Sequence, residues 1–412
     1  RNSCWNSGCA SARAAARNAR EVGMVDSVPD APRRLTLAHP RGVSDILVGP
    51  GLLASAGGGA LSEVAEWCRG RTVFLVTSEG PDRHCGAAAR KLLEPAARVE
   101  TLEVPDGEAA KTVECAASVW QRMLDRGGKR DSRLVTLGGG AVGDLGGFAA
   151  ACFLRGVDYM QIPTTLLAQV DASVGGKTGV DLAGGKNTVG AFHHPRFVLA
   201  DIDCLRSLPA AELRAGLFEV VKMAALLDLD LLALVEESLD RLLAVDAEVL
   251  TPVVAASIRA KLGVVEADLE EGDRRRLLNF GHTLGHAIES EFGYRGLRHG
   301  DAVGHGMRFA LRLALRRGLD GDFAARLRRL IDRLGPPALE EVERELGVRL
   351  DAARLIEAMG RDKKARESGL VWILPAAPGR GEIVPGLDPA LVRSELETFL
   401  DLSRAPAGGG SP

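Results

Sequence analysis

The chain of 412 residues lacks long apolar runs. No run reaches the roughly 18 residues that a membrane-spanning helix requires. The first 30 residues also lack the apolar centre that a secretory signal needs. We therefore expect a protein that neither spans a membrane nor is exported.

An excess of charge of one sign is also missing. The sequence has 52 Lys and Arg against 55 Asp and Glu, and the formal net charge is −3. Such a balance provides no basic field that would hold nucleic acid or an anionic membrane surface. These classes of partner are therefore not expected, and a small molecule is favoured.

The cysteines follow neither of the common structural patterns. There are seven, an odd number, and they are widely spaced without a C-x-x-C pair. This spacing argues against a disulfide framework and against a zinc knuckle. A reducing cytoplasm is the compartment that we expect.

The sequence does contain an alternation of strand and helix patterns between residues 35 and 205, in a chain longer than most single domains. This alternation predicts an α/β domain with a largely parallel sheet. The strands are expected at residues 45–48, 73–77, 133–137, 159–162 and 197–201.

After Leu208 the pattern changes to long stretches with helical periodicity. Helices are expected at 211–226, 246–268 and 301–317, and a small hairpin at 370–375 and 382–385. We predict an α/β domain over 31–207 and an α-helical domain over 208–402. Residues 1–30 are expected to be a disordered or non-native leader, or a transit peptide, and 403–412 a flexible tail.

Two turns follow predicted strands at places suited to a nucleotide. One strand runs into Gly138, Gly139 and Gly140, where backbone N–H groups can approach a diphosphate at the start of a helix. Thr164 and Thr165 follow another strand and supply hydroxyls at the sheet edge where ligands of open α/β folds bind. Taken alone, the glycine turn fits a purely structural role equally well, and a threonine pair is usually just a turn.

A group of polar residues in the second half follows a helical spacing of four, three and four: Arg275, Asn279, His282 and His286. If the segment is one helix, these side chains share a face. Gly281 and Gly285 each cost such a helix about 1 kcal/mol relative to Ala. That cost favours close approach of another group to this helix.

Glu219 and His299 extend this group to a possible metal site. Two imidazoles and one carboxylate can hold a catalytic zinc with one position open, so Glu219, His282 and His299 are the candidate ligands. Glu219 also stands three residues before Lys222. An ordinary ion pair within one helix is the alternative.

Further motifs, in order, carry a family resemblance: residues 170–179, 185–187, 190–192, 219–222, 279–286, His299 with Gly300, and 362–364. From about Arg34 to Leu400 the chain resembles the 3-dehydroquinate synthase family of sugar phosphate cyclases. The resemblance implies a Rossmann-like NAD-binding domain joined to an α-helical domain that binds metal and substrate, with the active site between them. It also implies a homodimer.

The resemblance assigns roles to individual residues. It repeats the metal set Glu219, His282 and His299, with zinc expected and cobalt the second choice. The residues that match the NAD site are Glu108, Lys111, Gly139, Gly140, Ala141, Asp144, Thr164, Thr165, Asp171, Lys186, Cys204 and Ser207. The residues that match the anchors of the substrate phosphate are Arg155, Lys177, Asn187 and one of Lys363 and Lys364, with Arg155 contributed across the dimer.

The remaining matches concern the reaction itself. Lys261 and Arg275 match the groups that hold a substrate carboxylate, and Lys222, Asn279, His286 and Asp171 complete the catalytic set. The activity implied is a lyase reaction on 3-deoxy-D-arabino-heptulosonate 7-phosphate. It combines transient oxidation by NAD, loss of phosphate, re-reduction and an intramolecular aldol closure. The sequence departs from the usual family residues at Ser78, Asp181 and Asp301.

Related enzymes are the alternatives. Cyclases that make 2-deoxy-scyllo-inosose or 2-epi-5-epi-valiolone act on substrates without a carboxylate, and Lys261 with Arg275 argues against them because unpaired buried cations are costly. An aminodehydroquinate synthase is harder to exclude, because its substrate keeps that carboxylate. Metal-dependent alcohol dehydrogenases of the glycerol dehydrogenase type share the architecture but do not explain residues 170–179.

Overall fold

The computed structural model describes residues 32–55, 59–183, 185–269, 274–361 and 370–404. The expected leader, the tail from residue 405 onward, and Lys363 and Lys364 lie outside the described residues. None of the helices in the described ranges is both long enough and apolar enough to cross a membrane.

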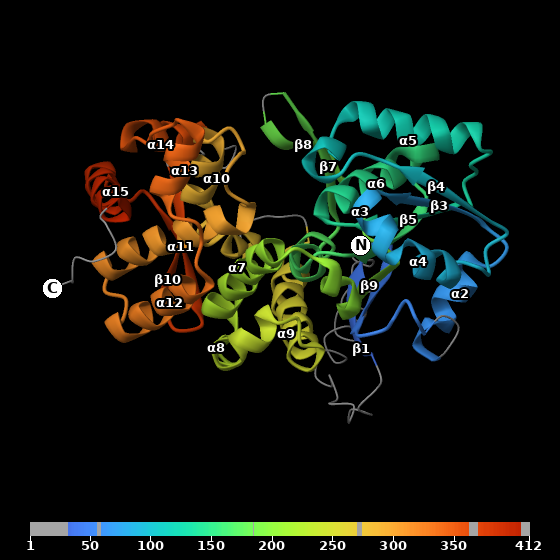
Figure 1. The fold of residues 1–412 in the computed structure, drawn as a ribbon, viewed down its shortest axis with the longest axis horizontal. Coiled ribbons are helices and arrows are strands. Elements are labelled where there is room, and N and C mark those ends of the chain that lie inside the picture. Colours follow the sequence, from blue (N-terminus) through green and yellow to red (C-terminus); the bar gives the residue numbers. More distant parts are fainter. Residues whose placement is uncertain (1–31, 56–58, 184, 270–273, 362–369, 405–412) are drawn as a thin grey trace, which may run out of the picture. The chain divides into compact units, whose positions relative to one another are not determined.

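A seven-stranded sheet organises the first half (Figure 1), with the strands in the order β1-β2-β9-β6-β5-β3-β4. Only β1 and β2 pair antiparallel; the other neighbours are parallel. The strands are β1 (Arg33–His39), β2 (Gly42–Gly49), β3 (Thr72–Thr77), β4 (Arg98–Glu103), β5 (Arg133–Gly138), β6 (Asp158–Pro163) and β9 (Phe197–Asp201). All five predicted strands are confirmed, with small shifts of their ends.

Helices cover both faces of this sheet. Val73 and Leu75 of β3 belong to a core cluster with α2 (Ser62–Cys68) and α4 (Ala87–Leu92). The alternate β3 residues join the opposite cluster, which contains residues of α5 (Val113–Asp125) and α6 (Gly140–Cys152). Because neighbouring side chains of a strand point to opposite faces, helices on both faces explain why residues 73–76 of β3 are all apolar and buried.

A separate two-stranded sheet follows β6 and was not predicted. It consists of β7 (Lys177–Leu182) and β8 (Gly185–Phe192), which pair antiparallel. The residues of β8 are exposed or half-buried, so the strand lacks the buried apolar residues of the five strands that were predicted.

The second half is helical, as predicted, and also contains the predicted hairpin of β10 (Val371–Ala377) and β11 (Arg380–Pro385). The helices are α7 (Ala210–Leu227), α8 (Leu229–Leu243), α9 (Ala247–Glu266), α10 (His282–Glu291), α11 (His299–Arg316), α12 (Gly321–Leu334), α13 (Leu339–Leu346), α14 (Ala352–Arg361) and α15 (Pro389–Arg404). Helix α15 includes Ser403 and Arg404, which were expected in the tail. The Arg404 guanidinium lies 2.6 Å from Glu343, and this contact fixes the end of the helix.

The segment from Arg275 to His286 is not one continuous helix, so the condition under which its four polar side chains would share a face is not met. A 3-10 helix (Arg274–Asn279) ends before Gly281, whose φ of 81° is left-handed, and α10 begins at His282. A left-handed residue cannot continue a right-handed helix, and only glycine adopts this conformation without strain. A Cβ at Gly281 would also lie 2.7 Å from the Val303 carbonyl oxygen of α11. Close packing against α11 therefore accompanies the break.

Helices α7 and α11 approach each other closely near their N-terminal halves. A Cβ at Gly300 would lie 2.0 Å from the carbonyl oxygen of Ala215, and one at Gly304 would lie 2.8 Å from the Phe218 ring. Neither position leaves space for a methyl group. The first turn of α11, which begins at His299, therefore depends on glycine for its position against α7.

We expect Gly300→Ala to destabilise the protein by about 2–3 kcal/mol, because the added methyl group forces α11 away from α7. Urea-induced unfolding followed by circular dichroism measures this change. Gly263→Ala is the matched control, since a Cβ at that position within α9 meets nothing within 4 Å. It should leave stability unchanged or raise it by up to about 1 kcal/mol. Equal stabilities for the two variants would contradict the packing argument.

Helix α15 is joined to α11 by a buried carboxylate. Glu395 lies 2.7 Å from the Arg312 guanidinium and 2.6 Å from that of Arg316. Burial raises the pKa of Glu395, but the hydrogen bonds from Arg316 and Arg312 lower it more, and the net pKa is below the usual value. The charged carboxylate therefore stabilises the fold above its unfolded-state pKa of about 4.3. That contribution is lost as the pH falls through the lower folded-state pKa.

Glu395→Gln should lower the free energy of unfolding by about 1–2 kcal/mol at neutral pH. The difference from the parent protein should shrink below about pH 4, where the parent also loses its charge at this position. Urea unfolding at both pH values measures the difference. Glu397→Gln, an exposed position on the same helix, should change stability by less than about 0.5 kcal/mol. A pH-independent loss in Glu395→Gln would contradict the ionic explanation.

Candidate active site

The glycine turn and the threonine pair lie side by side at one edge of the sheet. Strands β5 and β6 pair in parallel with Gly138 opposite Pro163, and the Thr164 N–H donates to the Gly138 carbonyl at 2.9 Å. A Cβ at Gly139 would lie 3.2 Å from the Thr165 methyl group. Helix α6 begins at Gly140. The sheet therefore brings the two predicted turns together beside the positive end of a helix.

A polar cluster next to α6 joins three of the predicted residues. The Lys111 ammonium donates to Asp144 at 2.9 Å and to the Asn187 side-chain oxygen at 2.5 Å. Burial raises the pKa of Asp144 above its usual value although Lys111 opposes this. Asn187 has a left-handed φ of 51°, and its backbone N–H donates to Asp181 at 2.6 Å. Glu108 lies exposed on the 3-10 turn just before Lys111.

A second cluster alternates positive and negative groups. The Lys261 ammonium on α9 donates to the Asp171 backbone oxygen at 2.6 Å and pairs with the Asp171 carboxylate. Lys222 lies 3.7 Å from the other oxygen of that carboxylate and also pairs with Glu219. Burial raises the pKa of Asp171, but Lys261 and Lys222 lower it to a net value below the usual range. Burial lowers the pKa of Lys261 more than Asp171 raises it.

The three candidate metal ligands lie together. Glu219 is fully buried on α7, and its Oε1 atom is 3.7 Å from His282 Nε2 and 3.6 Å from His299 Nε2. His286 joins them, because ring nitrogens of His282, His286 and His299 all lie within 4.8 Å of one another. His286 is exposed and His282 is buried. The cluster is therefore closed on the Glu219 side and open on the His286 side.

The donor atoms fit a divalent metal ion. The Glu219 Oε1 atom has no hydrogen-bond donor among the described residues, whereas Oε2 pairs with the Lys222 ammonium. A buried carboxylate oxygen without a donor is unfavourable, and a cation would satisfy it. The His282 Nδ1 atom lies 3.2 Å from the Phe280 carbonyl oxygen, so Nε2 is the nitrogen directed at Glu219. Burial and Lys222 lower the pKa of His282, which favours the neutral imidazole that binds metals.

Glu289 is a buried residue of this site that sequence reasoning did not identify. Its Oε2 atom lies 3.0 Å from His299 Nδ1, and its Oε1 atom lies 3.7 Å from the Lys186 ammonium. Burial raises the pKa of Glu289, but the hydrogen bond with His299 lowers it to a net value of about 2. The available signal is its position seven residues after His282, which places both on one face of α10.

Arg275 and Asn279 come from the 3-10 helix before α10. Arg275 is buried, donates to the Gly175 carbonyl oxygen at 3.0 Å, and has its guanidinium 5.8 Å from the centre of the Phe192 ring. Asn279 is half-buried at the end of the same turn. Arg275 is therefore held against the 170–179 segment.

Asp301, one of the departures from the family pattern, is fully buried in the first turn of α11. Its Oδ1 atom lies 3.5 Å from Arg214 Nε on α7. This ion pair joins the two helices that carry His299 and Glu219.

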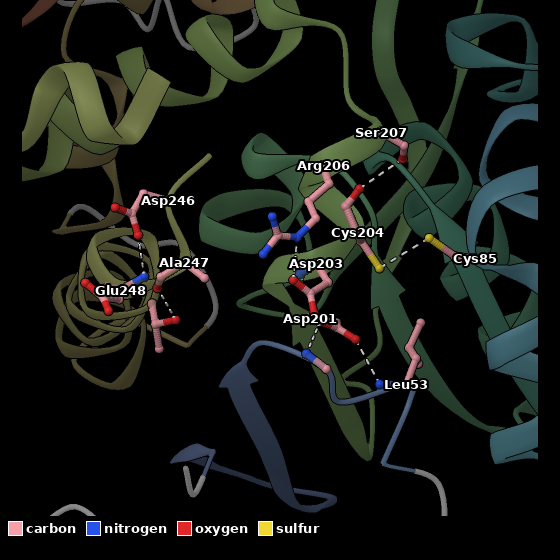
Figure 2. A network of polar contacts seen from close by, with 12 residues as sticks. Leu53, Cys85, Asp201, Asp203, Cys204, Arg206, Ser207, Asp246, Ala247 and Glu248 are labelled. Carbon is pink, nitrogen blue, oxygen red and sulfur yellow. Dashed lines mark hydrogen bonds and ion pairs between the residues drawn. The ribbon is translucent and has the colours of Figure 1, made fainter. Parts of the chain in front are cut away.

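Four other predicted residues, Arg155, Lys177, Cys204 and Ser207, come from elements of the first half of the chain. Arg155 is exposed after α6 with a left-handed φ of 69°, and Lys177 is exposed at the start of β7. Figure 2 shows the 3-10 turn after β9, where the Cys204 sulfur lies 3.4 Å from the Cys85 sulfur and the Ser207 hydroxyl donates to the Cys204 carbonyl at 3.1 Å. Among the described interactions, none joins Arg155, Cys204 or Ser207 to Glu219 or the histidines.

Two family profiles match adjoining parts of this chain. The profile described as 3-dehydroquinate synthase N-terminal matches residues 101–215, and the one described as 3-dehydroquinate synthase C-terminal matches residues 216–365. The 3-dehydroquinate synthase of Symbiobacterium thermophilum is 43% identical over 357 residues, which cover 86% of this chain and 97% of that protein.

Solved structures of related cyclases share the fold. A 2-deoxy-scyllo-inosose synthase in complex with carbaglucose-6-phosphate, NAD+ and Co2+ is 25% identical, with a TM-score of 0.77, covering 89% of this chain and 99% of that chain. The 2-epi-5-epi-valiolone synthase of Streptomyces hygroscopicus subsp. jinggangensis 5008, with NAD+ and Zn2+ bound, is 27% identical, with a TM-score of 0.76, covering 87% and 97%. Two adjoining family profiles and a relative aligned over nearly its whole length lead to one conclusion: the chain belongs to the 3-dehydroquinate synthase family.

Proposed function

We propose that this protein is a 3-dehydroquinate synthase. It converts 3-deoxy-D-arabino-heptulosonate 7-phosphate to 3-dehydroquinate and inorganic phosphate, a lyase step of the shikimate pathway. The observation that carries the proposal is the buried Glu219 carboxylate facing His282 and His299, with Lys222 and Lys261 beside it. Family membership supports the same activity.

The metal site consists of Glu219, His282 and His299. Zinc is the first choice and cobalt the second, in keeping with the ions in the two related cyclases. When bound, the metal supplies a Lewis acid for hydroxyl and carbonyl oxygens, and NAD supplies a hydride acceptor that is restored within each turnover. His286 lies close enough to contact substrate oxygens beside the metal.

The NAD site lies at the sheet edge formed by the ends of β5 and β6. Its backbone N–H groups and the start of α6 suit a diphosphate, and Thr164 and Thr165 follow β6 at the same edge. The residues proposed to form it are Glu108, Lys111, Gly139, Gly140, Ala141, Asp144, Thr164, Thr165, Asp171, Lys186, Cys204 and Ser207.

The substrate carries negative charge at both ends, so several fixed cations are needed to hold it. Lys261 and Arg275 hold the carboxylate. Both are buried and already positioned by contacts with the 170–179 segment. The anchors proposed for the phosphate are Arg155, Lys177, Asn187, Lys363 and Lys364.

Lys222, Asn279 and His286 orient substrate hydroxyls and move protons. Lys222 is fully buried between the carboxylates of Glu219 and Asp171, which hold it protonated and fixed in direction. His286 is exposed and can exchange protons with solvent. Loss of phosphate and ring closure both require proton transfer, and these three side chains would supply it.

The organisation of the chain adds further proposals. The boundary between the two domains lies at residues 207 and 208, between the 3-10 turn after β9 and the start of α7. A homodimer accounts for the exposed position of Arg155, which would then reach the phosphate of the neighbouring subunit. The free thiols of the described cysteines suit a reducing cytoplasm.

The activity test combines purified protein with the heptulosonate phosphate, NAD+ and Zn2+. Phosphate and dehydroquinate should appear in equal amounts without accumulation of NADH, since the hydride is returned. A protein that instead converts glucose 6-phosphate or sedoheptulose 7-phosphate is one of the related cyclases, and the proposal is then wrong. If the protein converts only the aminated heptulosonate phosphate, it is an aminodehydroquinate synthase.

His282→Ala should reduce activity by about 1000-fold or more and remove stoichiometric zinc, because one of three ligands is lost. Metal content by mass spectrometry and the far-ultraviolet circular dichroism spectrum separate this effect from unfolding. His84→Ala, at an exposed position far along the chain from the cluster, is the control and should keep both metal and activity. Full zinc content in a folded His282→Ala protein would contradict the ligand role.

A further inference from the structure

We infer that Glu289 is a positioning residue for the metal site: its carboxylate fixes the ring orientation and tautomer of His299, and Lys186 holds it from the other side. The inference rests on the proposed metal site. Neither the sequence motifs nor the proposed catalytic set includes Glu289.

The geometry divides the two nitrogens of His299 between two carboxylates. Nδ1 lies 3.0 Å from Glu289 Oε2, while Nε2 lies 3.6 Å from Glu219 Oε1. A carboxylate accepts, so Nδ1 carries the proton in this contact. The lone pair of Nε2 is then directed toward Glu219 and His282, where the metal is proposed to bind. Such a partner on the second nitrogen normally orients a metal-binding imidazole.

His299 needs this support more than His282 does. The His282 ring is buried, and a backbone carbonyl lies beside its Nδ1 atom. The His299 side chain is 34% exposed, so packing alone restrains its ring less. Glu289 is 5% exposed and cannot move far on α10. The fixed carboxylate therefore restrains the more mobile ligand.

Lys186, on β8 of the two-stranded sheet, is the second charged neighbour of Glu289. Its ammonium lies 3.7 Å from Glu289 Oε1 and 4.3 Å from the centre of the Tyr294 ring. The ring holds the cation beside the carboxylate. One side chain of the proposed NAD site thereby contacts the residue that orients a metal ligand. Movement of β8 would change the electrostatic environment of Glu289.

Glu291 is a control that distinguishes the orientation of a metal ligand from a general effect on the stability of α10. Glu291 lies on the same helix, its side chain is 7% exposed, and it pairs with Arg354 at 2.7 Å. It resembles Glu289 in residue type and burial, but its partner is an arginine of α14. Removing either carboxylate should therefore affect stability, whereas only Glu289 should affect metal binding.

The test is titration of metal-free protein with Co2+, followed by the visible absorption of the bound ion, for the parent chain and four variants. Glu289→Ala should raise the dissociation constant about 10–100-fold. Glu289→Gln keeps an acceptor but loses the charge, so it should raise the constant by a smaller factor, about 3–10-fold. Glu291→Ala should change it less than about twofold although its melting temperature falls. His299→Ala should abolish binding.

The outcomes separate this inference from the proposed metal site. If His299→Ala loses the metal but Glu289→Ala binds it as tightly as the parent chain, the positioning role is wrong and the metal site stands. If the parent chain does not bind Co2+, or His299→Ala binds it normally, the positioning role and the proposed metal site are both wrong. Should Glu289→Ala fail to fold by circular dichroism, Glu289→Gln decides, and parent-like affinity in that variant overturns the inference.

Discussion

The carboxylate of Glu219 imposes the main constraint on this protein. It is fully buried on a helix whose other neighbours are largely apolar, and burial of an isolated charge is strongly unfavourable. Lys222 pairs with Oε2 and balances part of the charge, yet Oε1 has no hydrogen-bond donor among the described residues. Two imidazoles face the same carboxylate. The surrounding helices are arranged so that a second cation can approach, which is the physical basis of the proposed metal site.

The charges around Glu219 alternate in sign over several residues. Lys261 contacts Asp171, Asp171 lies near Lys222, and Lys222 contacts Glu219. Each buried charge has an opposite neighbour, and such networks persist only when every member is paired. A substrate carboxylate held by Lys261 would join the network at one end, while the proposed metal would join it at the other. Binding of the substrate and binding of the metal would therefore each change the charge balance of the same network of side chains.

The sequence predicts the central parts of the fold better than its edges. Strands β3, β5 and β6 are buried along nearly their whole length and were recognised as short β-rich runs between helical patterns. The outer strands β1 and β4 carry charged and half-exposed residues, so the same signal is absent. The left-handed conformation of Gly281 was not predicted, because the residue type permits that conformation without requiring it.

The residues of the candidate site were also predicted only in part. Glu219, His282 and His299 were identified from residue type and spacing together with the resemblance, and the structure brings them together. The partner of His299 was missed, because a glutamate on an amphipathic helix normally faces solvent, and only the packing of α10 against α11 shows that Glu289 is buried. The positions of Lys363 and Lys364 lie outside the described residues.

The break at Gly281 has a consequence for how the protein responds to metal supply. Because α10 starts at His282, the first residue of that helix is itself a proposed ligand, while the other two ligands lie on α7 and α11. An ion bound there connects three helices that are otherwise joined by packing and polar contacts. Binding to the folded state alone raises stability with free ion concentration. Scarcity of zinc would then lower the amount of intact protein as well as the fraction that is active, since a less stable form is degraded faster.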